Sequence, residues 1–263
     1  MKILITNDDG IRAPGLIALR AALLRQSSFD PLAEVLVIAP ERPRSACGHA
    51  ITLHKPLRLM PVEFPDGGRG FAINGFPADC IALGVSEHLG GRPDIIISGI
   101  NQGPNLGVDM TYSGTVAAAR EGAICGLPSF AISVASYQAC DFGPAAEFAC
   151  NLAQAVLERG LPPGSFLNVN VPPLPSSEIR GVMYTRQSRI RYSNRIERRT
   201  DPRGGSYYWL TGDRLDHSGQ PDADAAVIEQ KHISVTPVRL NVTDETFLAA
   251  LPSWNLRWPD KVR

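Results

Sequence analysis

Residues 3–24 read ILITNDDGIRAPGLIALRAALL, and this stretch decides the fold class. Its first residues, Ile3–Thr6, form a short apolar run that is typical of a buried strand. Leucines at 16, 19, 23 and 24 then recur with the spacing of one face of a helix over Pro14–Leu24. A buried strand followed closely by a helix predicts a β–α–β unit, in which the next strand runs parallel to the first.

The same alternation continues to residue 171. We predict further strands at Val35–Ala39, Phe71–Asn74, Ile95–Ser98, Ser129–Val134 and Phe166–Val171, and further helices starting at Pro77, at Ser113–Gly122 and at Pro144–Arg159. Pro77 suits the first turn of a helix, where no N–H is needed, and Gly160 suits a helix end. Continuous apolar strands separated by helices predict an α/β fold with a mostly parallel sheet covered on both faces.

The pattern changes after about Pro175. Residues 181–210 are polar and predict long strands or a hairpin, with seven arginines between Arg186 and Arg203. A short helix near Asp222–Gln230, a strand at Ile233–Val238 and a helical stretch at Phe247–Trp254 are expected to follow. We therefore expect an α/β core at 1–180 and a hairpin and C-terminal segment at 181–263, within one globular unit. For the arginines, a solvated hairpin face, a rim that attracts anions and an oligomer contact all remain open.

Composition argues against several classes of protein. The chain has 263 residues, with 26 basic and 26 acidic side chains and no net charge, so we expect no stable nucleic-acid partner. No window approaches 18 uninterrupted apolar residues, so we expect no membrane span. The five cysteines are odd in number and form no CxxC pair, which predicts reduced thiols in a cytoplasmic protein.

Two adjacent carboxylates follow the first strand directly, in Asn7-Asp8-Asp9-Gly10. They repel each other, and burying either one without a partner is costly. At the carboxyl end of a parallel strand they lie where open α/β sheets place their ligands, and a divalent cation would offset the repulsion. Asn-Asp-Asp-Gly is equally good turn chemistry, so the tetrapeptide alone leaves an exposed turn as an equal alternative.

Two other strands lead into loops with oxygen donors, Ser45 after the second strand and Asn101 after the isoleucine-rich strand. If these strands neighbour the first one, Ser45 and Asn101 converge with Asp8 and Asp9 on one point. Four oxygen donors suit Mg²⁺ or Mn²⁺ and poorly suit zinc, which prefers His and Cys. A solvated serine and a capping or turn asparagine are the alternatives for Ser45 and Asn101.

A third feature is the helix start at 111–116, TYSGTV. Free backbone amides with serine and threonine hydroxyls at a helix N-terminus form an anion site. The preceding loop 99–107 has three glycines and two asparagines, so its backbone is free to wrap a phosphate. Simple N-capping by Ser113, without any ligand, is the alternative.

Motifs of other enzyme classes do not occur in the sequence. It has no GxGxxG for a dinucleotide, no GxxxxGK[ST] for a P-loop, no HExxH and no GxSxG. The five histidines show no metal-binding spacing. The oxygen-rich strand ends and the helix start at Ser113 are therefore the features on which a functional hypothesis rests.

Several longer stretches carry a resemblance to a known family. They are ILITNDDGIRAPGL at 3–16, VIAPERPRSACGHAITL at 37–53, NGFPADC at 74–80, PDIIISGINQGPNLGVDMTYSGTVAAAREG at 93–122, DPRGGSYYWL at 201–210 and SVTPV at 234–238. In these stretches the chain resembles the SurE family, the stationary-phase survival protein nucleotidases. The matches run in family order from residue 1 to about 240, and the block at 93–122 is highly specific.

The resemblance implies a Rossmann-like core with a protruding hairpin and a C-terminal segment that help to build homodimers or homotetramers. It implies a 5′-nucleotidase, a phosphomonoesterase of nucleoside 5′- and 3′-monophosphates with one divalent cation per subunit, Mg²⁺ or Mn²⁺. The family's metal ligands fall on Asp8, Asp9, Ser45 and Asn101, and its phosphate-contacting positions fall on Asn105, Ser113, Gly114 and Thr115. Three positions depart from the family pattern: Ala46 and Gln230 stand where glycine is common, and Phe76 stands where threonine is usual.

Metal-assisted hydrolysis is the mechanism that we expect, with Asp8 or Asp9 accepting a proton from the attacking water. The helix start at Ser113 and Thr115 would hold the other phosphate oxygens. Two other functions stay open. One is a non-catalytic nucleotide- or RNA-binding module that uses the arginine-rich hairpin. The other is a phosphatase that forms an aspartyl-phosphate, although that class has Asp-x-Asp, whereas Gly10 and Ile11 stand two residues beyond Asp8 and Asp9.

Overall fold

The structure is a computed structural model that describes residues 1–25, 34–89, 91–189, 191–193, 195–212, 214–215 and 220–256. The first half contains β1 (Lys2–Thr6), α1 (Pro14–Arg25), β2 (Glu34–Pro40), β3 (Leu59–Glu63), β4 (Arg69–Ile73), α2 (Pro77–Gly84), β5 (Ile95–Gln102), α3 (Gly114–Ile124), β6 (Ser129–Val134), α4 (Gly143–Arg159) and β7 (Ser165–Val171). The second half contains β8 (Val182–Tyr184), β9 (Arg191–Tyr192), β10 (Arg195–Thr200), β11 (Ser206–Thr211), β12 (Arg214–Leu215), α5 (Asp224–Glu229), β13 (Ile233–Arg239) and α6 (Glu245–Ala250). Short 3₁₀ turns lie at Glu87–Leu89, Gly107–Thr111, Ser176–Glu178 and Leu251–Trp254.

The main sheet is mostly parallel, as predicted. In the described part of the chain it has the strand order β3-β4-β2-β1-β5-β6-β7-β13-β8. Strands β4, β2, β1, β5, β6 and β7 each run parallel to their neighbours in that series. At one edge β3 pairs antiparallel with β4, and at the other β13 pairs antiparallel with β7 and parallel with β8. Strands from the second half of the sequence therefore complete the sheet of the first half.

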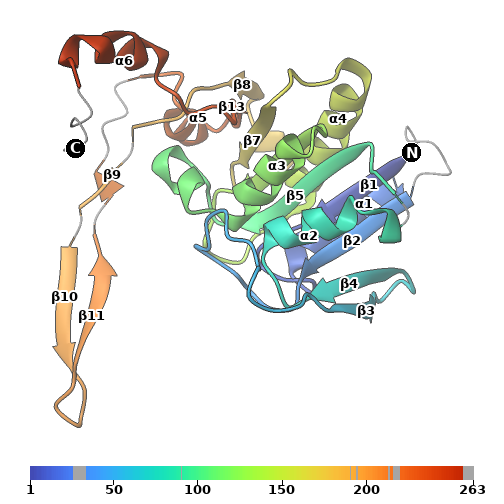
Figure 1. The fold of residues 1–263 in the computed structure, drawn as a ribbon. Helices are drawn as coiled ribbons and strands as arrows, with labels where there is room; N and C mark the ends of the chain where they lie inside the picture. The colour runs from blue at the N-terminus through green and yellow to red at the C-terminus, as the bar shows by residue number, and fades with distance from the viewer. Residues whose placement is uncertain are drawn as a thin grey trace, which may run out of the picture.

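Helices cover both faces of this sheet (Figure 1). Ile3 and Ile5 of β1 pack with residues of α1 and α4, whereas Leu4 between them packs with residues of α2 and α3. Successive side chains of a strand point to opposite faces, so a strand buried on both faces has an uninterrupted apolar run. That is the physical reason why Ile3–Thr6 was recognisable as a core strand.

The helices that follow β1 and β5 lie on opposite faces, although these two strands are neighbours. α1 leads from β1 to β2 on one face, and α3 leads from β5 to β6 on the other. At such a switch point the two connections leave a crevice at the carboxyl ends of the strands, where open α/β sheets bind ligands.

Strands β10 and β11 form an antiparallel hairpin that projects away from the main sheet, and we call residues 191–215 the arm (Figure 1). The predicted hairpin is confirmed. Every residue of β11 is exposed, including Leu210 at 87 %. A two-stranded hairpin on its own is marginally stable in water, and the apolar side chains of β11 are not buried against the main sheet.

Two predictions about strands need correction. Strand β3 was not predicted, because Pro61 interrupts its sequence LMPVE and its side chains are largely exposed at the sheet edge. Strand β5 was predicted to end at Ser98 but continues to Gln102, with a shift in its pairing to β6 between Ser98 and Asn101. Asn101 therefore belongs to the end of the strand and not to a loop beyond it.

All five cysteines lie within the described residues and are free, as their spacing predicted. None of the helices in the described ranges is both long enough and apolar enough to cross a membrane.

Candidate active site

The carboxyl ends of β2, β1 and β5 lie side by side, as the convergence of Asp8, Asp9, Ser45 and Asn101 requires. A hollow of about 620 Å³ opens at this point. Its lining is Asp8, Asp9, Ser45, Ala46, Asn101, Gln102, Gly103, Pro104, Asn105, Asp109, Tyr112, Ser113 and Tyr137. The structure thus brings together all four predicted metal ligands and two of the predicted phosphate contacts, Asn105 and Ser113.

The turn that carries the two carboxylates is held by Asn7. Its Nδ2 donates to the carbonyl of Gly10 over 3.0 Å, and its Oδ1 accepts from the N–H of Gly10 over 3.1 Å. Gly10 has a φ of 102°, a region in which a side chain is strained. The backbone carbonyl of Asp8 accepts from the N–H of Arg44 over 2.7 Å, which ties the turn to the loop that carries Ser45.

Burial raises the pKa of both carboxyl groups. Asp8 is 4 % exposed, and desolvation, only partly opposed by a hydrogen bond from Thr115, raises its pKa to about 6, with repulsion from Asp9 adding to the shift. Desolvation also raises the pKa of Asp9. The N–H of Gln102, which donates to Asp9 Oδ2 over 3.2 Å, opposes this shift only in part. In the described part of the chain no lysine or arginine forms an ion pair with either one. At neutral pH the pair is therefore costly to ionise unless a cation binds it.

Ser45 and Asn101 complete the set of oxygen donors. Asn101 Nδ2 donates to the carbonyl of Gly103 over 2.8 Å. The side-chain oxygen of Asn101 is therefore the atom that can bind a cation in the pocket. Ser45 is exposed, and the next residue, Ala46, has a left-handed φ of 53°. That conformation costs a residue with a Cβ more than it costs glycine. The guanidinium of Arg44 lies 5.3 Å from the ring centre of Phe76, so Phe76 contacts the residue that precedes Ser45.

The start of α3 supports the carboxylates as well as the pocket. Ser113 caps the helix, since its Oγ accepts from the N–H of Val116 over 3.1 Å, and it also lines the hollow. The Thr115 hydroxyl donates to Asp8 Oδ1, and the backbone of Thr115 also hydrogen-bonds this carboxyl. A Cβ at Gly114 would lie 2.8 Å from Asp8 Cβ and 2.8 Å from Cys47 Sγ. Gly114 and Thr115, predicted as phosphate contacts, thus pack against Asp8 and do not line the hollow.

Asn105 is fixed by a buried polar network that the sequence analysis missed. Its N–H donates to Asn170 Oδ1 and its Nδ2 to Ser133 Oγ, both over 2.8 Å. Its carbonyl accepts from Nδ2 of Asn168 over 2.8 Å and of Asn170 over 3.0 Å. Asparagines at alternate positions of the apolar stretch 166–171 were the available signal, since two buried amides on one face of a core strand need partners.

Asp109 and Tyr137 line the hollow but lie outside the two stretches in which the sequence analysis predicted a phosphate site, 99–107 and 111–116. Gln102, Gly103, Pro104 and Tyr112 lie within these stretches, where no individual contact was assigned to them. Tyr112 and Tyr137 are 61 % and 75 % exposed, respectively. Tyr137 reaches the hollow from the loop after β6, and its carbonyl accepts from Gln102 Nε2 over 3.2 Å. Nothing in the sequence around it marks it as a pocket residue, because its neighbours are set by the order of strands in the sheet.

The donor set fits a hard divalent cation. Two carboxylates, a hydroxyl and an amide oxygen are ligands of the kind that Mg²⁺ and Mn²⁺ take. Over the described ranges no group of three or more His, Cys, Asp or Glu residues is placed to hold a metal ion. A metal site here therefore depends on Ser45 and Asn101 in addition to the carboxylates, unlike a zinc site.

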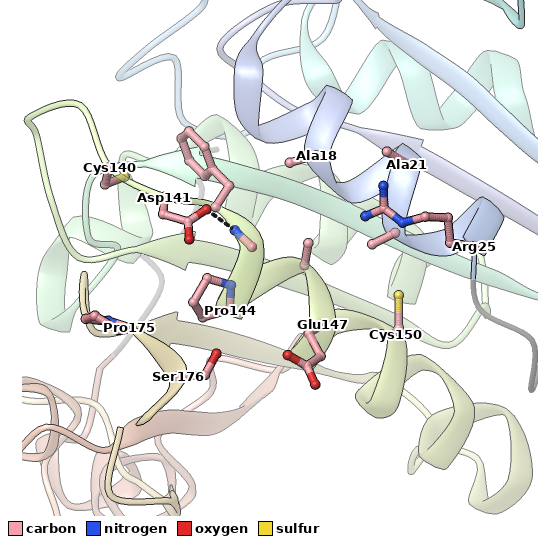
Figure 2. A pocket seen from close by; sticks show the side chains of 14 residues that line it. Ala18, Ala21, Arg25, Cys140, Asp141, Pro144, Glu147, Cys150, Pro175 and Ser176 are labelled. Carbon is pink, nitrogen blue, oxygen red and sulfur yellow. Dashed lines mark hydrogen bonds between the residues drawn. The ribbon is translucent and has the colours of Figure 1, made fainter. Parts of the chain in front are cut away.

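A larger hollow of about 820 Å³ lies in the groove between α1 and α4. Figure 2 shows that its polar side chains do not gather at one point: Cys140 lies at the opposite side from Cys150, and Arg25 stands apart from Glu147. Asp141 makes a local hydrogen bond, accepting from the N–H of Gly143 over 2.8 Å. Size alone does not make a site, and we place the candidate active site in the smaller hollow because its acidic and amide groups converge.

The fold and the site together define a mostly parallel α/β protein with a pocket rich in oxygen donors at its switch point. The family model for survival protein SurE matches residues 3–194. 5′-Nucleotidase SurE of Moorella thermoacetica is 46 % identical over 261 residues, which cover 98 % of each chain. The protein of the same name from Desulfatibacillum aliphaticivorans is 47 % identical over 259 residues, with 98 % of this chain and all of that one covered. The crystal structure of SurE protein from Aquifex aeolicus matches with a TM-score of 0.82 and 35 % identity, over 97 % of this chain and 100 % of that one. The chain belongs to the SurE family, which confirms the resemblance seen in the sequence.

Proposed function

We propose that this chain is a 5′-nucleotidase, a divalent-cation-dependent phosphomonoesterase that releases phosphate from nucleoside 5′-monophosphates and also from 3′-monophosphates. The observation that carries the proposal is the convergence of Asp8, Asp9, Ser45 and Asn101 beside the N-terminus of α3. The relatives named 5′-nucleotidase SurE support the 5′ activity. One Mg²⁺ or Mn²⁺ per chain, held by these four residues, is part of the proposal.

Different residues of the chain have different roles in the hydrolysis. When bound, the cation would supply charge compensation and make a water molecule more acidic. Thr115 holds Asp8 Oδ1, so Asp8 is the fixed ligand. Asp9 Oδ2 accepts from Gln102, and Asp9 Oδ1 takes the proton of the attacking water. The Ser113 hydroxyl, the Asn105 side-chain amide and the N–H of Gly114 at the start of α3 bind the phosphate oxygens.

The size and lining of the hollow support a nucleoside as the rest of the substrate. A volume of about 620 Å³ is far larger than a phosphate group needs and lies within the usual range for small-molecule sites. Tyr112 and Tyr137 line it and are exposed, and every nucleobase has a face that stacks on an aromatic ring. This favours nucleotides over small phosphomonoesters.

We also propose that the protein is a homodimer or homotetramer in the cytoplasm, assembled through residues 181–263 and without a stable nucleic-acid partner. The exposed apolar side chains of the arm support the assembly, because a partner copy would remove them from water. The five free cysteines support a reducing compartment.

A phosphate-release assay over nucleoside 5′- and 3′-monophosphates tests the function. We expect no turnover after chelation and recovery when Mg²⁺ or Mn²⁺ is restored. Full turnover in excess EDTA would exclude the metal mechanism, and tight nucleotide binding without any turnover would favour a binding module. Acid quenching with a ³²P-labelled substrate separates the remaining alternative, since protein-bound label would indicate an aspartyl-phosphate.

A further inference from the structure

Asp224 is a fully buried carboxylate that lies outside the candidate active site. Its Oδ2 accepts from the N–H of Gly107 over 2.9 Å. Its Oδ1 accepts from the N–H of Ser188 over 3.0 Å and from the N–H of Ala225 over 2.7 Å. One carboxylate thus joins three segments of the chain, and hydrogen bonds from three backbone amides stabilise its buried charge.

Gly107 is held from both sides by the C-terminal half. While its N–H donates to Asp224, its carbonyl accepts from Gln187 Nε2 over 2.8 Å. The preceding residue, Leu106, packs in a small apolar cluster with Ala225 of α5 and its neighbour Ile228. The chain at 106–107 is therefore fixed by two polar contacts and one apolar contact, all from beyond residue 186.

This fixed point lies in the middle of the loop that builds the pocket. Residues 103–113 supply Asn105, Asp109, Tyr112 and Ser113 to the lining of the hollow. The 3₁₀ turn Gly107–Thr111 begins at the held residue and leads directly to the start of α3. A shift of Gly107 would therefore move the phosphate-binding residues on both sides of it.

The other side of the contact is the root of the arm. Ser188 and Gln187 come just before β9, the first strand of the arm. Arg186 forms a β-bridge with Ala223 and an ion pair with Asp222 over 2.7 Å, so this root is joined to the start of α5. A series of contacts therefore runs from residues 186–188, which precede the arm, through Asp224 to the pocket loop.

We propose that Asp224 is a positioning residue for the active site, which locks the pocket loop 103–113 to the root of the arm. The proposal rests on the function proposed above, because it assigns Asp224 to the same pocket. It makes the geometry for binding a nucleoside monophosphate depend on the C-terminal half of the chain, although Asp224 itself does not contact the hollow.

Asp224→Asn tests the lock with a minimal change in shape. The amide has one acceptor oxygen in place of two and turns an NH₂ group towards backbone donors, so the Gly107 bond and the Ser188 bond cannot both persist. We expect kcat/KM for a nucleoside 5′-monophosphate to fall about 10- to 100-fold, with most of the change in KM, because substrate-binding groups are displaced. We also expect amide hydrogen exchange within 103–113 to become about 10-fold faster or more, since hydrogen bonds to a buried charge are lost.

Asp79→Asn is the matched control. Asp79 is also buried and accepts three hydrogen bonds, from the N–H of Thr52, the hydroxyl of Thr52 and the N–H of Phe76, and none of these residues lines the hollow. This variant should lower the melting temperature while leaving KM and the exchange of 103–113 close to those of the wild type. If Asp224→Asn does not fold, Gln187→Met removes only the contact to the Gly107 carbonyl, and a smaller change in KM and exchange is expected in the same direction.

The proposal would be overturned if Asp224→Asn and Asp79→Asn changed KM and the exchange of 103–113 equally. It would also be overturned if the exchange of 103–113 stayed unchanged in both Asp224→Asn and Gln187→Met. A wild-type protein that releases no phosphate would contradict the proposed function instead. The exchange measurement needs no turnover, so it would still decide whether Asp224 holds the loop.

Discussion

The strand ends around Asp8 and the arm are built in opposite ways. Every residue of β1 is buried, whereas every residue of β11 is exposed. The carboxylate of Asp8 and the amide of Asn105 are both anchored by groups far away in the sequence. On the arm, by contrast, Arg199 forms an ion pair over 2.9 Å with Glu197, two residues away in the sequence. The main sheet and the helices that cover it, which we call the body, thus fix chemical groups in position, while the arm presents a surface.

This difference indicates where each region gets its stability. The body buries its apolar side chains in its own core, on both faces of the sheet. The arm leaves Ile196 and Leu210 63 % and 87 % exposed on directly opposed positions of its two strands. An exposed ion pair such as Arg199–Glu197 contributes little. Changes in the body should therefore damage chemistry, and changes in the arm should damage assembly.

The largest expected effect is that of Asp9→Asn on turnover. Loss of one of the two carboxylates should weaken cation binding and remove the proton acceptor, and lower kcat on the order of a thousandfold, equivalent to about 4 kcal/mol. The fold should persist, because the change removes a desolvated charge beside Asp8. Phosphate release and thermal melting, each with and without Mg²⁺, check both parts.

Asp141→Asn is the control for this variant, since Asp141 lies in a neighbouring loop and lines the other hollow. It should keep normal turnover and the Mg²⁺-dependent rise in melting temperature of the wild type. At a hundredfold excess of Mg²⁺ over its Kd, binding raises the free energy of unfolding by about 2.7 kcal/mol. An Asp9→Asn protein that melts higher with Mg²⁺ to the same extent as the wild type would show that the cation binds elsewhere.

Thr115→Val should have the next largest effect. It keeps the shape of the side chain but removes the hydroxyl that donates to Asp8 Oδ1. A hydrogen bond to a charged group contributes about 1.5–3 kcal/mol, so we expect turnover to fall about 10- to 150-fold as Asp8 loses its fixed orientation. Melting curves and steady-state kinetics at saturating Mg²⁺ check this. A lowered melting point with normal kcat would mean that Thr115 stabilises the helix start and has no part in the reaction.

The arm is tested by Leu210→Glu, which puts a charge where a partner copy would bury an apolar side chain. An anchor in the centre of an interface is worth about 2 kcal/mol or more, so the oligomer should dissociate at micromolar concentration while the body stays folded. Light scattering and circular dichroism measure the two properties. Leu53→Glu is the control, because Leu53 is 85 % exposed and lies outside residues 181–263. A wild-type chain that is monomeric at that concentration would contradict the proposed assembly.

The contrast between the two regions also explains what the sequence predicted. The body strands were recognisable because burial on both faces requires continuous apolar runs, and the carboxylates were recognisable because they follow such a run directly. The contacts of Asn105 and Asp224 were not, because their partners stand 65 and 117 residues away and are set by the order of strands and the path of the chain. The arm was predicted as a hairpin, but its exposure is a property of the folded structure alone.

Tyr137→Ala separates recognition of the nucleoside from recognition of the phosphate. Stacking of one base on an aromatic ring contributes about 1–3 kcal/mol, and the 75 % exposure of Tyr137 favours the lower end of this range. We expect KM for nucleoside monophosphates to rise about 5- to 10-fold with little change in kcat. KM for p-nitrophenyl phosphate should rise less, because its smaller ring does not reach the same area. An equal rise for both substrates would indicate that Tyr137 only shapes the loop against Gly103.

The smallest expected effect is a gain in stability from Ala46→Gly, next to the proposed ligand Ser45. Ala46 has a φ of 53°, and a left-handed conformation costs a residue with a Cβ roughly 1–2 kcal/mol more than it costs glycine. Glycine gives back part of this gain through the greater entropy of the unfolded chain, so we expect a net stabilisation of about 0.5–1 kcal/mol in chemical denaturation. Ala50→Gly is the control in the same loop, since Ala50 is not among the described residues with positive φ. At this position glycine relieves no strain and only increases the entropy of the unfolded chain, so the substitution should destabilise the protein. Turnover of Ala46→Gly should equal or exceed that of the wild type, because the change relieves strain beside Ser45 without removing a donor. Destabilisation by both substitutions would show that the backbone at Ala46 carries no strain of this kind.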